Sequence, residues 1–382
     1  MKRQAGHPVR VVGTGAYLPG EPVGFDDIDR VLGALTEAPE DLQRWYARAK
    51  QTMRSLLGME VYHFAVDRST GQLNETPSTL AAKAAERALE AAGMAASDID
   101  ALFYAGSSQD AFICPPTSTF VQQHLGIARC EEVSIHANCT STYKAIRLAA
   151  DQIALGRYRT ALVSTANMVS GHALAATLNQ RALTRHQAML RLFLCDGGGA
   201  LVLTRDEGAQ PGFEVWDTFI ESVGGRDAPQ MFSRYGSASV APVAFAAGDH
   251  HVTQNMGLVG SLGVNVFIAG FQRFMDQLGL DPGSADFQEQ VTHLLANVPS
   301  DHLVDAAMED GSARFRVPME VLRRVYTSTV AKRGYTGPAA VVITLDALMR
   351  ARAVADGKFV VSFVTESSKW MNAGFLLRYR EG

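Results

Sequence analysis

The stretch that decides the fold runs from Glu132 to Gly156 and reads EVSIHANCTSTYKAIRLAADQIALG. Its first residues, 132–137, include Val and Ile, which favour a short strand. Residues 141–155 are rich in Ala and Leu, which favour a helix, and Gly156 is a typical helix stop. Cys139 therefore lies at a turn that leads from a strand into a long helix.

The same alternation continues on both sides of this stretch. A short β-branched segment at Val9–Val12 predicts a buried strand followed by a tight turn at Gly13-Thr14-Gly15. A helix is expected within Asn74–Gly93 and a strand at Ala101–Gly106. Further on, the pattern predicts a helix at Thr117–Leu125 and a strand at 159–165. This order is typical of an α/β layered fold.

The second half of the chain repeats the first. Residues 156–166 match residues 357–367 almost class for class, at an offset of 201 residues (357 minus 156). A repeat of this length is too long for a solenoid. We therefore expect two similar halves, an N-terminal one over residues 1–207 that carries Cys139 and a C-terminal one over 208–382.

Composition excludes several classes of protein. The 382 residues are 47% hydrophobic and 19% charged, with a formal net charge of −4, as in a well-packed soluble protein. No block of like charge suggests nucleic acid, and no apolar run reaches the ~20 residues of a membrane span. The four cysteines show no metal-binding spacing. We expect a cytoplasmic protein with no metal and with neither nucleic acid nor membrane as a partner.

The position of Cys139 suggests chemistry. The first N–H groups of a helix lack partners and carry partial positive charge, which should lower the pKa of a thiol there. The same groups can receive the oxygen of a thioester carbonyl as it becomes tetrahedral. The alternative is a small buried core residue, and position alone does not separate the two interpretations.

Several segments together resemble the β-ketoacyl-acyl-carrier-protein synthase III group of the thiolase superfamily. They occur in family order and are Gly13–Pro19, Asn74–Thr79, Ala137–Cys139, Asp196–Ala200 and Phe375–Tyr379. The resemblance implies a thiolase-like α/β fold with five αβαβα layers, and a homodimer. It also implies that Cys139 takes an acyl group from acyl-CoA or an acyl carrier protein. Coenzyme A or phosphopantetheine then serves as substrate carrier, and no other cofactor is implied.

The chain departs from this family at the residues that support decarboxylation of a malonyl thioester. Asn297 stands where the family has a histidine, and Tyr335 stands where it has an asparagine. The loop that is glycine-rich in the family here reads SSKWMN over residues 367–372, and it includes Ser368, a candidate substrate-binding residue. An amide at residue 297 cannot accept a proton near pH 7.

Two further residues complete the predicted site. His302 follows Asn297 by five residues and is our first candidate for a replacement base, although a surface histidine is the simpler interpretation. By analogy with the family, Phe112 lies in a loop that closes the acyl pocket of the partner subunit. The alternative for Phe112 is packing on its own subunit.

The sequence therefore predicts an acyltransferase that loads Cys139 and passes the acyl group to a small-molecule acceptor. The setting would be secondary-metabolite or fatty-acid-like biosynthesis. One alternative is a decarboxylative condensing enzyme with a rearranged site built from Asn297, Tyr335 and His302. Another is a non-catalytic partner subunit, against which the retained Cys139 argues.

Overall fold

The computed structural model describes residues 6–208, 210–299 and 301–382, without the side chains of Asp301 and His302. Nine strands form one continuous sheet in the order β3-β2-β4-β5-β1-β6-β11-β10-β9. The strands are β1 (Val9–Tyr17), β2 (Ala101–Ala105), β3 (Glu131–Ile135), β4 (Thr160–Asn167), β5 (Gly197–Arg205), β6 (Gly212–Ser222), β9 (Val291–Ala296), β10 (Phe359–Glu366) and β11 (Met371–Arg380). A small separate ribbon pairs β7 (Met231–Phe232) with β8 (Thr253–Gln254).

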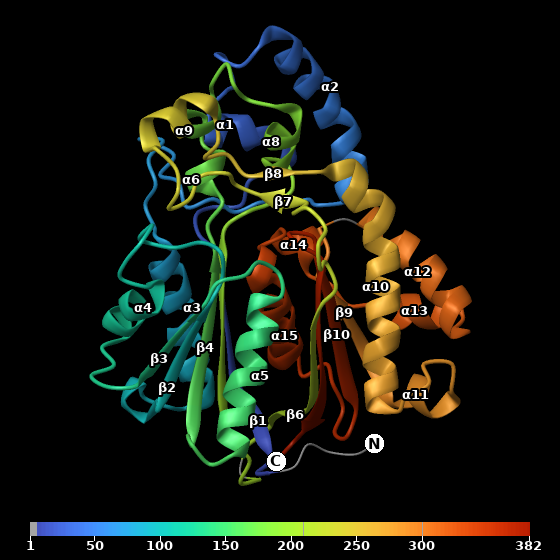
Figure 1. Ribbon diagram of the computed structural model, residues 1–382. Helices are drawn as coiled ribbons and strands as arrows, with labels where there is room; N and C mark the ends of the chain where they lie inside the picture. Colours follow the sequence, from blue (N-terminus) through green and yellow to red (C-terminus); the bar gives the residue numbers. More distant parts are fainter. Residues whose placement is uncertain (1–5, 209, 300) are drawn as a thin grey trace.

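Three hydrophobic clusters arrange these strands and their helices into five layers (Figure 1). Helices α5 (Ser141–Ala154) and α15 (Ala340–Ala351) pack in the middle, between the strands of the two halves. Helices α3 (Pro77–Ala92) and α4 (Thr117–Leu125) cover the outer face of the first half. Helix α10 (Met256–Leu278) covers the outer face of the second. This confirms the expected thiolase-like arrangement.

The two halves have matching topologies. In the first half β2 runs parallel to β4, β4 antiparallel to β5, and β5 antiparallel to β1. In the second half β9, β10, β11 and β6 repeat these relations in the same order. The counterpart of β3 is reduced to a single parallel bridge between Leu294 and Tyr326. The halves join where β1 meets β6, at the pairs Arg10–Glu214 and Val11–Phe213.

The expected turn at Gly13 and Gly15 was wrong, because β1 continues through both residues to Tyr17. The two glycines instead allow a helix to pack closely against the strand. A Cβ atom on Gly13 would lie 2.2 Å from the carbonyl oxygen of Ala88, and one on Gly15 would lie 2.1 Å from that of Ala84. Both contacts are with α3, so the missing side chains let this helix lie directly on the strand.

The remaining helices mostly surround the upper part of the molecule and the second half (Figure 1). Among the described residues, α10 is the one helix that could cross a membrane by length and composition. Its C-terminal half is instead buried on the sheet through Phe271, Phe274 and Met275. The other helices are α1 (Ile28–Leu32), α2 (Glu40–Leu57), α6 (Ser170–Ala173), α7 (Ala175–Leu178), α8 (Arg185–Leu190), α9 (Ala241–Ala247), α11 (Ala285–Gln290), α12 (Asp301–Phe315), α13 (Met319–Val325) and α14 (Val330–Arg333), with short 3-10 turns at Phe25–Asp27, Ala96–Asp98 and Gly337–Ala339.

Candidate active site

Cys139 lies in the short connection between β3 and α5, as the sequence predicts. Its side chain touches both the central core and the cluster formed by the N-terminal helices. Thr140 is the N-cap residue of α5 but already has helical backbone angles. The thiol is therefore held at the start of the central helix, at the carboxyl end of a parallel strand, which is where α/β folds commonly place reactive groups.

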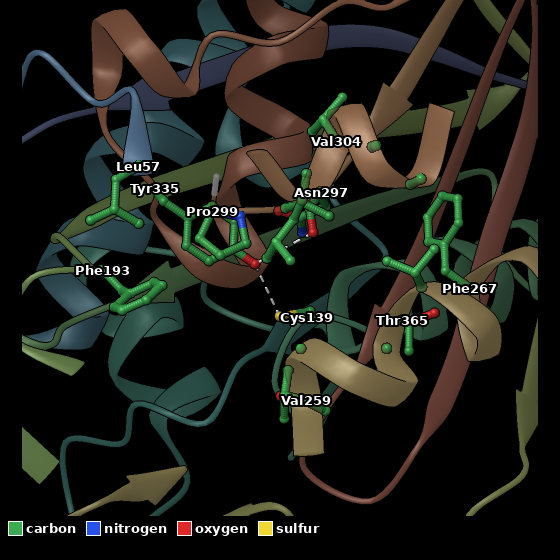
Figure 2. Close-up of a pocket in the computed structure, with 18 of the residues that line it drawn as sticks. Leu57, Cys139, Phe193, Val259, Phe267, Asn297, Pro299, Val304, Tyr335 and Thr365 are labelled. Atoms are coloured by element: carbon green, nitrogen blue, oxygen red, sulfur yellow. Dashed lines mark hydrogen bonds between the residues drawn. The ribbon is translucent and has the colours of Figure 1, made fainter. Parts of the chain in front are cut away.

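A cavity of about 390 Å³ opens in front of Cys139 (Figure 2). Its walls come from α2, α10, α12 and the segment 189–194, and most of the side chains that line it are apolar. Leu57, Phe193, Val259, Phe267 and Val304 show this character. No histidine among the described side chains lines the cavity. A space of this composition suits an apolar chain rather than a charged substrate.

The structure brings together three of the predicted site residues. The sulfur of Cys139 lies 3.3 Å from the hydroxyl oxygen of Tyr335 (Figure 2). The same hydroxyl lies 3.5 Å from the backbone carbonyl oxygen of Asn297. Its single proton can be donated to only one of these acceptors at a time. Tyr335 thus connects the nucleophile position to residue 297.

Asn297 follows β9 and is almost fully buried, with 6% of its surface exposed. Its Nδ2 donates a hydrogen bond to the carbonyl oxygen of Gly337 at 3.1 Å. Its Oδ1 has no hydrogen-bond partner among the described residues. The amide therefore presents an unpaired acceptor beside the cavity that it lines.

Glu366, the last residue of β10, caps the helix that follows Cys139. Its carboxylate accepts hydrogen bonds from the backbone N–H of Thr140 at 2.9 Å and from the Thr140 hydroxyl at 2.6 Å. It also accepts one from the hydroxyl of Ser368. Glu366 is 2% exposed, so its charge acts with little screening by water.

The expected lowering of the thiol pKa was wrong. Burial, and after it the charge of Glu366, raise the pKa of Cys139 to about 12. The hydrogen bond from Tyr335 and the backbone N–H of Cys139 itself act in the opposite direction without reversing the shift. The main physical reason is burial of the thiol, which disfavours the charged form. In addition, Glu366 already occupies the N-terminal end of α5, where partial positive charge would otherwise favour the thiolate.

The other predicted site residues lie as follows. The hydroxyl of Ser368 is bound to Glu366, whereas its neighbour Ser367 lines the cavity. Phe112 is 58% exposed and stacks on Tyr235, with ring centroids 5.0 Å apart, so it packs on its own subunit here. The backbone of His302 belongs to the first turn of α12, but its side chain lies outside the described part of the chain.

Sequence reasoning missed two features of this site. Glu366 was overlooked, although an acidic residue that ends a strand of buried side chains is a signal for a buried polar contact. The cavity was also overlooked, because its walls come from helices far apart in the chain. Within the described residues, no group of three or more His, Cys, Asp or Glu side chains is placed to hold a metal ion.

Known proteins match this chain in sequence. The family described as 3-oxoacyl-[acyl-carrier-protein (ACP)] synthase III matches residues 133–224, which include Cys139. A β-ketoacyl-[acyl-carrier-protein] synthase III of Desulfitobacterium hafniense is 29% identical over 305 residues, which is 79% of this chain and 79% of its own length. A protein of the same name from Rhodospirillum centenum is 31% identical over 198 residues, about half of each chain (52%).

Solved structures match the whole fold. The tetronic acid condensing enzyme AbyA1 superposes with a TM-score of 0.77 at 23% identity, over 97% of this chain and 99% of its own. A 3-oxoacyl-[acyl-carrier-protein] synthase III from Aquifex aeolicus superposes with a TM-score of 0.73 at 18% identity, over 97% and 100%. The molecule is thus a thiolase-fold protein.

The sequence matches and the superposed structures point to the same group of proteins. In sequence and in fold the chain is similar to 3-oxoacyl-acyl-carrier-protein synthase III proteins, which share the thiolase-like fold. The matched proteins are named as synthases and as a condensing enzyme.

Proposed function

We propose that this chain is an acyltransferase that takes an acyl group from acyl-CoA or an acyl carrier protein onto Cys139 and passes it to a second nucleophile. The observation that carries this proposal is the placement of the Cys139 sulfur at an apolar cavity, with the Tyr335 hydroxyl 3.3 Å away. The cavity has room for an apolar chain, and the sulfur stands where the carbonyl end of that chain would lie. The similarity to acyl-carrier-protein synthases supports an acyl thioester as the donor.

In the first step the Cys139 sulfur attacks the thioester carbonyl. A new S–C bond forms, the bond to the departing thiol breaks, and the proton of Cys139 ends on that thiol. Because the pKa of Cys139 is about 12, the sulfur stays protonated at neutral pH until the donor binds. Burial and the neighbouring Cys139 sulfur raise the pKa of Tyr335 well above its usual value, so Tyr335 remains a hydrogen-bond donor throughout.

Two donors flank the reacting sulfur. One is the Tyr335 hydroxyl, and the other is the backbone N–H of Cys139, which lies close enough to the sulfur to favour the thiolate. Either can stabilise the oxyanion of a tetrahedral intermediate. The N–H of Thr140, in contrast, is taken by Glu366. The proposal therefore gives Tyr335 the role of oxyanion donor and Glu366 that of a positioning residue.

In the second step the acceptor attacks the acyl-Cys139 carbonyl, and the proton of the acceptor returns to the sulfur. A decarboxylative condensation is the second candidate, because the curated relatives carry the name of β-ketoacyl synthases. The cavity offers that reaction no histidine among the described side chains, and residue 297 is an amide. A non-catalytic partner subunit is the third candidate, and the cavity in front of Cys139 argues against it.

Intact-protein mass spectrometry tests the proposal. The protein is mixed with acyl-CoA and acyl-carrier thioesters of increasing chain length, and the expected result is a mass increase of one acyl group. The Cys139→Ala variant is the control and should show no increase. An equal adduct on Cys139→Ala would refute the assignment of the nucleophile, and no adduct from any thioester would favour the non-catalytic candidate.

A further inference from the structure

Asn297 stands out among the polar side chains of the cavity. Three other polar side chains of the cavity have partners: Asn138 accepts from Ser107 at 2.8 Å, and Thr365 donates to Asn372 at 2.6 Å. Asn167 donates to the carbonyl oxygen of Cys195 at 2.8 Å. Oδ1 of Asn297 has no such partner in the described part of the chain, although the residue is 94% buried. A buried acceptor without a donor is costly, so it marks a place where a donor is expected to bind.

The direction of the Asn297 amide is set by the fold. The Gly337 carbonyl oxygen can only accept a hydrogen bond, so it requires Nδ2 of Asn297 on its side. Rotating the amide by half a turn would place two oxygens against each other and lose that bond. Oδ1 is therefore the atom left over for a bound molecule.

We propose that Oδ1 of Asn297 binds an N–H group of the acceptor, and that the acceptor is a primary amine. This inference rests on the proposed acyl transfer and adds the chemical class of the second substrate. Tyr335 links the two sites, because its hydroxyl lies 3.3 Å from the Cys139 sulfur and 3.5 Å from the Asn297 backbone oxygen. Asn297 and Cys139 also line the same cavity, so a donor held by Oδ1 shares that space with the acyl group on Cys139.

The alternative ligands fit this atom less well. An acyl chain carries no hydrogen-bond donor. A malonyl thioester presents carboxylate and carbonyl oxygens near its reacting carbon, which would repel Oδ1. The amide N–H groups of a pantetheine arm are donors, and the test below separates them from the acceptor.

The transfer step balances without a further reactant. The amine nitrogen forms a bond to the acyl carbon, the bond from that carbon to Cys139 breaks, and one amine proton ends on the sulfur. The second N–H stays on the nitrogen and donates to Oδ1 throughout. Because an amide oxygen is not a base at neutral pH, Asn297 orients the nucleophile and does not take its proton.

The first test measures how the loaded enzyme partitions between two nucleophiles. Cys139 is acylated with decanoyl-CoA, the free coenzyme is removed, and deacylation by n-butylamine or by 1-propanethiol is followed by intact mass. The thiol, unlike the amine, keeps no N–H or O–H group when it attacks as thiolate. In Asn297→Leu the rate with amine should fall about tenfold relative to the rate with thiol. Ser367→Ala, which changes another cavity residue, should leave this ratio unchanged.

Asn297→Gln is the second variant, because it keeps both an amide donor for the Gly337 carbonyl and an oxygen acceptor. It should retain the preference for amine that Asn297→Leu loses. Equal loss of both rates in Asn297→Leu would show a merely structural role and overturn the inference, as would an unchanged ratio. If Asn297→Leu is loaded more slowly by decanoyl-CoA but keeps the same ratio of amine rate to thiol rate, Oδ1 binds the pantetheine arm. That outcome would also overturn the inference.

The second test does not need turnover. In a Cys139→Ala background, calorimetry compares the binding of N-methyldecanamide, which has an N–H group, with that of methyl decanoate, which has none. The amide should lose about tenfold in affinity when Asn297→Leu is added, and the ester should not. Equal changes for both ligands would overturn the inference. Failure of the wild-type protein to load any thioester would count against the proposed function alone, because this binding result stands independently.

Discussion

The carboxylate of Glu366 accepts a hydrogen bond from the backbone N–H of Thr140 at 2.9 Å. It thereby caps the first turn of the helix that follows Cys139. A carboxylate thus sits where a synthase of this fold would be expected to favour a thiolate. The arrangement stabilises α5 through a charge at its N-terminus. Together with burial of the thiol, the charge of Glu366 keeps Cys139 protonated at neutral pH. Reactivity at Cys139 must therefore come from the bound substrate and from Tyr335.

The first prediction concerns the pH dependence of Cys139. Because the pKa of Cys139 is raised to about 12, the thiolate fraction should increase about tenfold per pH unit between pH 7 and 10, with no plateau. The rate of alkylation by iodoacetamide, followed by intact mass, should rise in the same way. A plateau near pH 8 would show an activated thiol and contradict the prediction.

Glu366→Gln removes the charge but leaves an oxygen that can accept from Thr140. Loss of a nearby negative charge favours the thiolate, so the pKa of Cys139 should fall and alkylation at pH 8 should accelerate by about tenfold or more. Glu221→Gln is the control, because Glu221 pairs with Arg273 and Asn372 rather than with the helix of Cys139. The same rate change in both variants would exclude a local effect.

The second prediction concerns Tyr335→Phe. The ring and its packing remain, but the donor 3.3 Å from the Cys139 sulfur is lost. Loss of an oxyanion donor typically costs ~10²–10³-fold, so acylation of Cys139 in single-turnover experiments should slow by about that factor. Binding of N-methyldecanamide should change little, because the cavity walls are intact. Unchanged acylation would remove Tyr335 from the mechanism.

The third prediction concerns malonyl thioesters. With Asn297 and Tyr335 in place of the family residues, release of carbon dioxide should be slow or absent, since acid–base assistance is typically worth ~10²–10⁴-fold. The double variant Asn297→His with Tyr335→Asn restores the residue types of the family and should raise the rate. Rapid release of carbon dioxide by the wild-type protein, with a β-keto product, would instead support the condensing enzyme.

The fourth prediction concerns the length of the acyl chain. Gly260 of α10 lines the cavity, and a Cβ atom there would meet no other atom within 4 Å. Gly260→Leu should fill part of the cavity and also favour the helix. Loading by the longest accepted acyl-CoA should fall by about tenfold while shorter chains load normally. Ser261→Leu adds the same side chain at a position that does not line the cavity, and it should leave the chain-length profile unchanged.

The fifth prediction concerns assembly. β3 lies at one edge of the sheet. In the loop that precedes α4, the exposed fraction is 58% for Phe112 and 80% for Ile113. We propose that a second copy of the chain covers them, so light scattering should give about twice 41.2 kDa. Ile113→Asp should weaken the dimer, whereas Leu155→Asp, at another exposed apolar residue, should not. A monomer at micromolar concentration would contradict the proposal.

Much of the fold could be predicted because it depends on local sequence patterns such as helix caps and hydrophobic periodicity. The helix that begins after Thr76 follows from its cap and its Ala-rich face, and the strand-to-helix turn at Cys139 follows from a change in periodicity. The prediction that Asn297 and Tyr335 lie in one site came from the family resemblance and not from the local sequence pattern. The turn expected at Gly13 failed because glycine in a strand can also reflect a helix packed closely on it.

The sequence by itself determined the order of strands and helices, their repetition in two halves and the place of Cys139 at the start of α5. Only the tertiary structure decided the electrostatics of that thiol, because burial raises its pKa and Glu366 reaches the helix from 226 residues away in the chain. It also decided which atom of Asn297 faces the cavity, through the carbonyl of Gly337. The physical reason is that local patterns reflect burial and backbone geometry, whereas pKa values and unpaired polar atoms depend on neighbours that folding brings together.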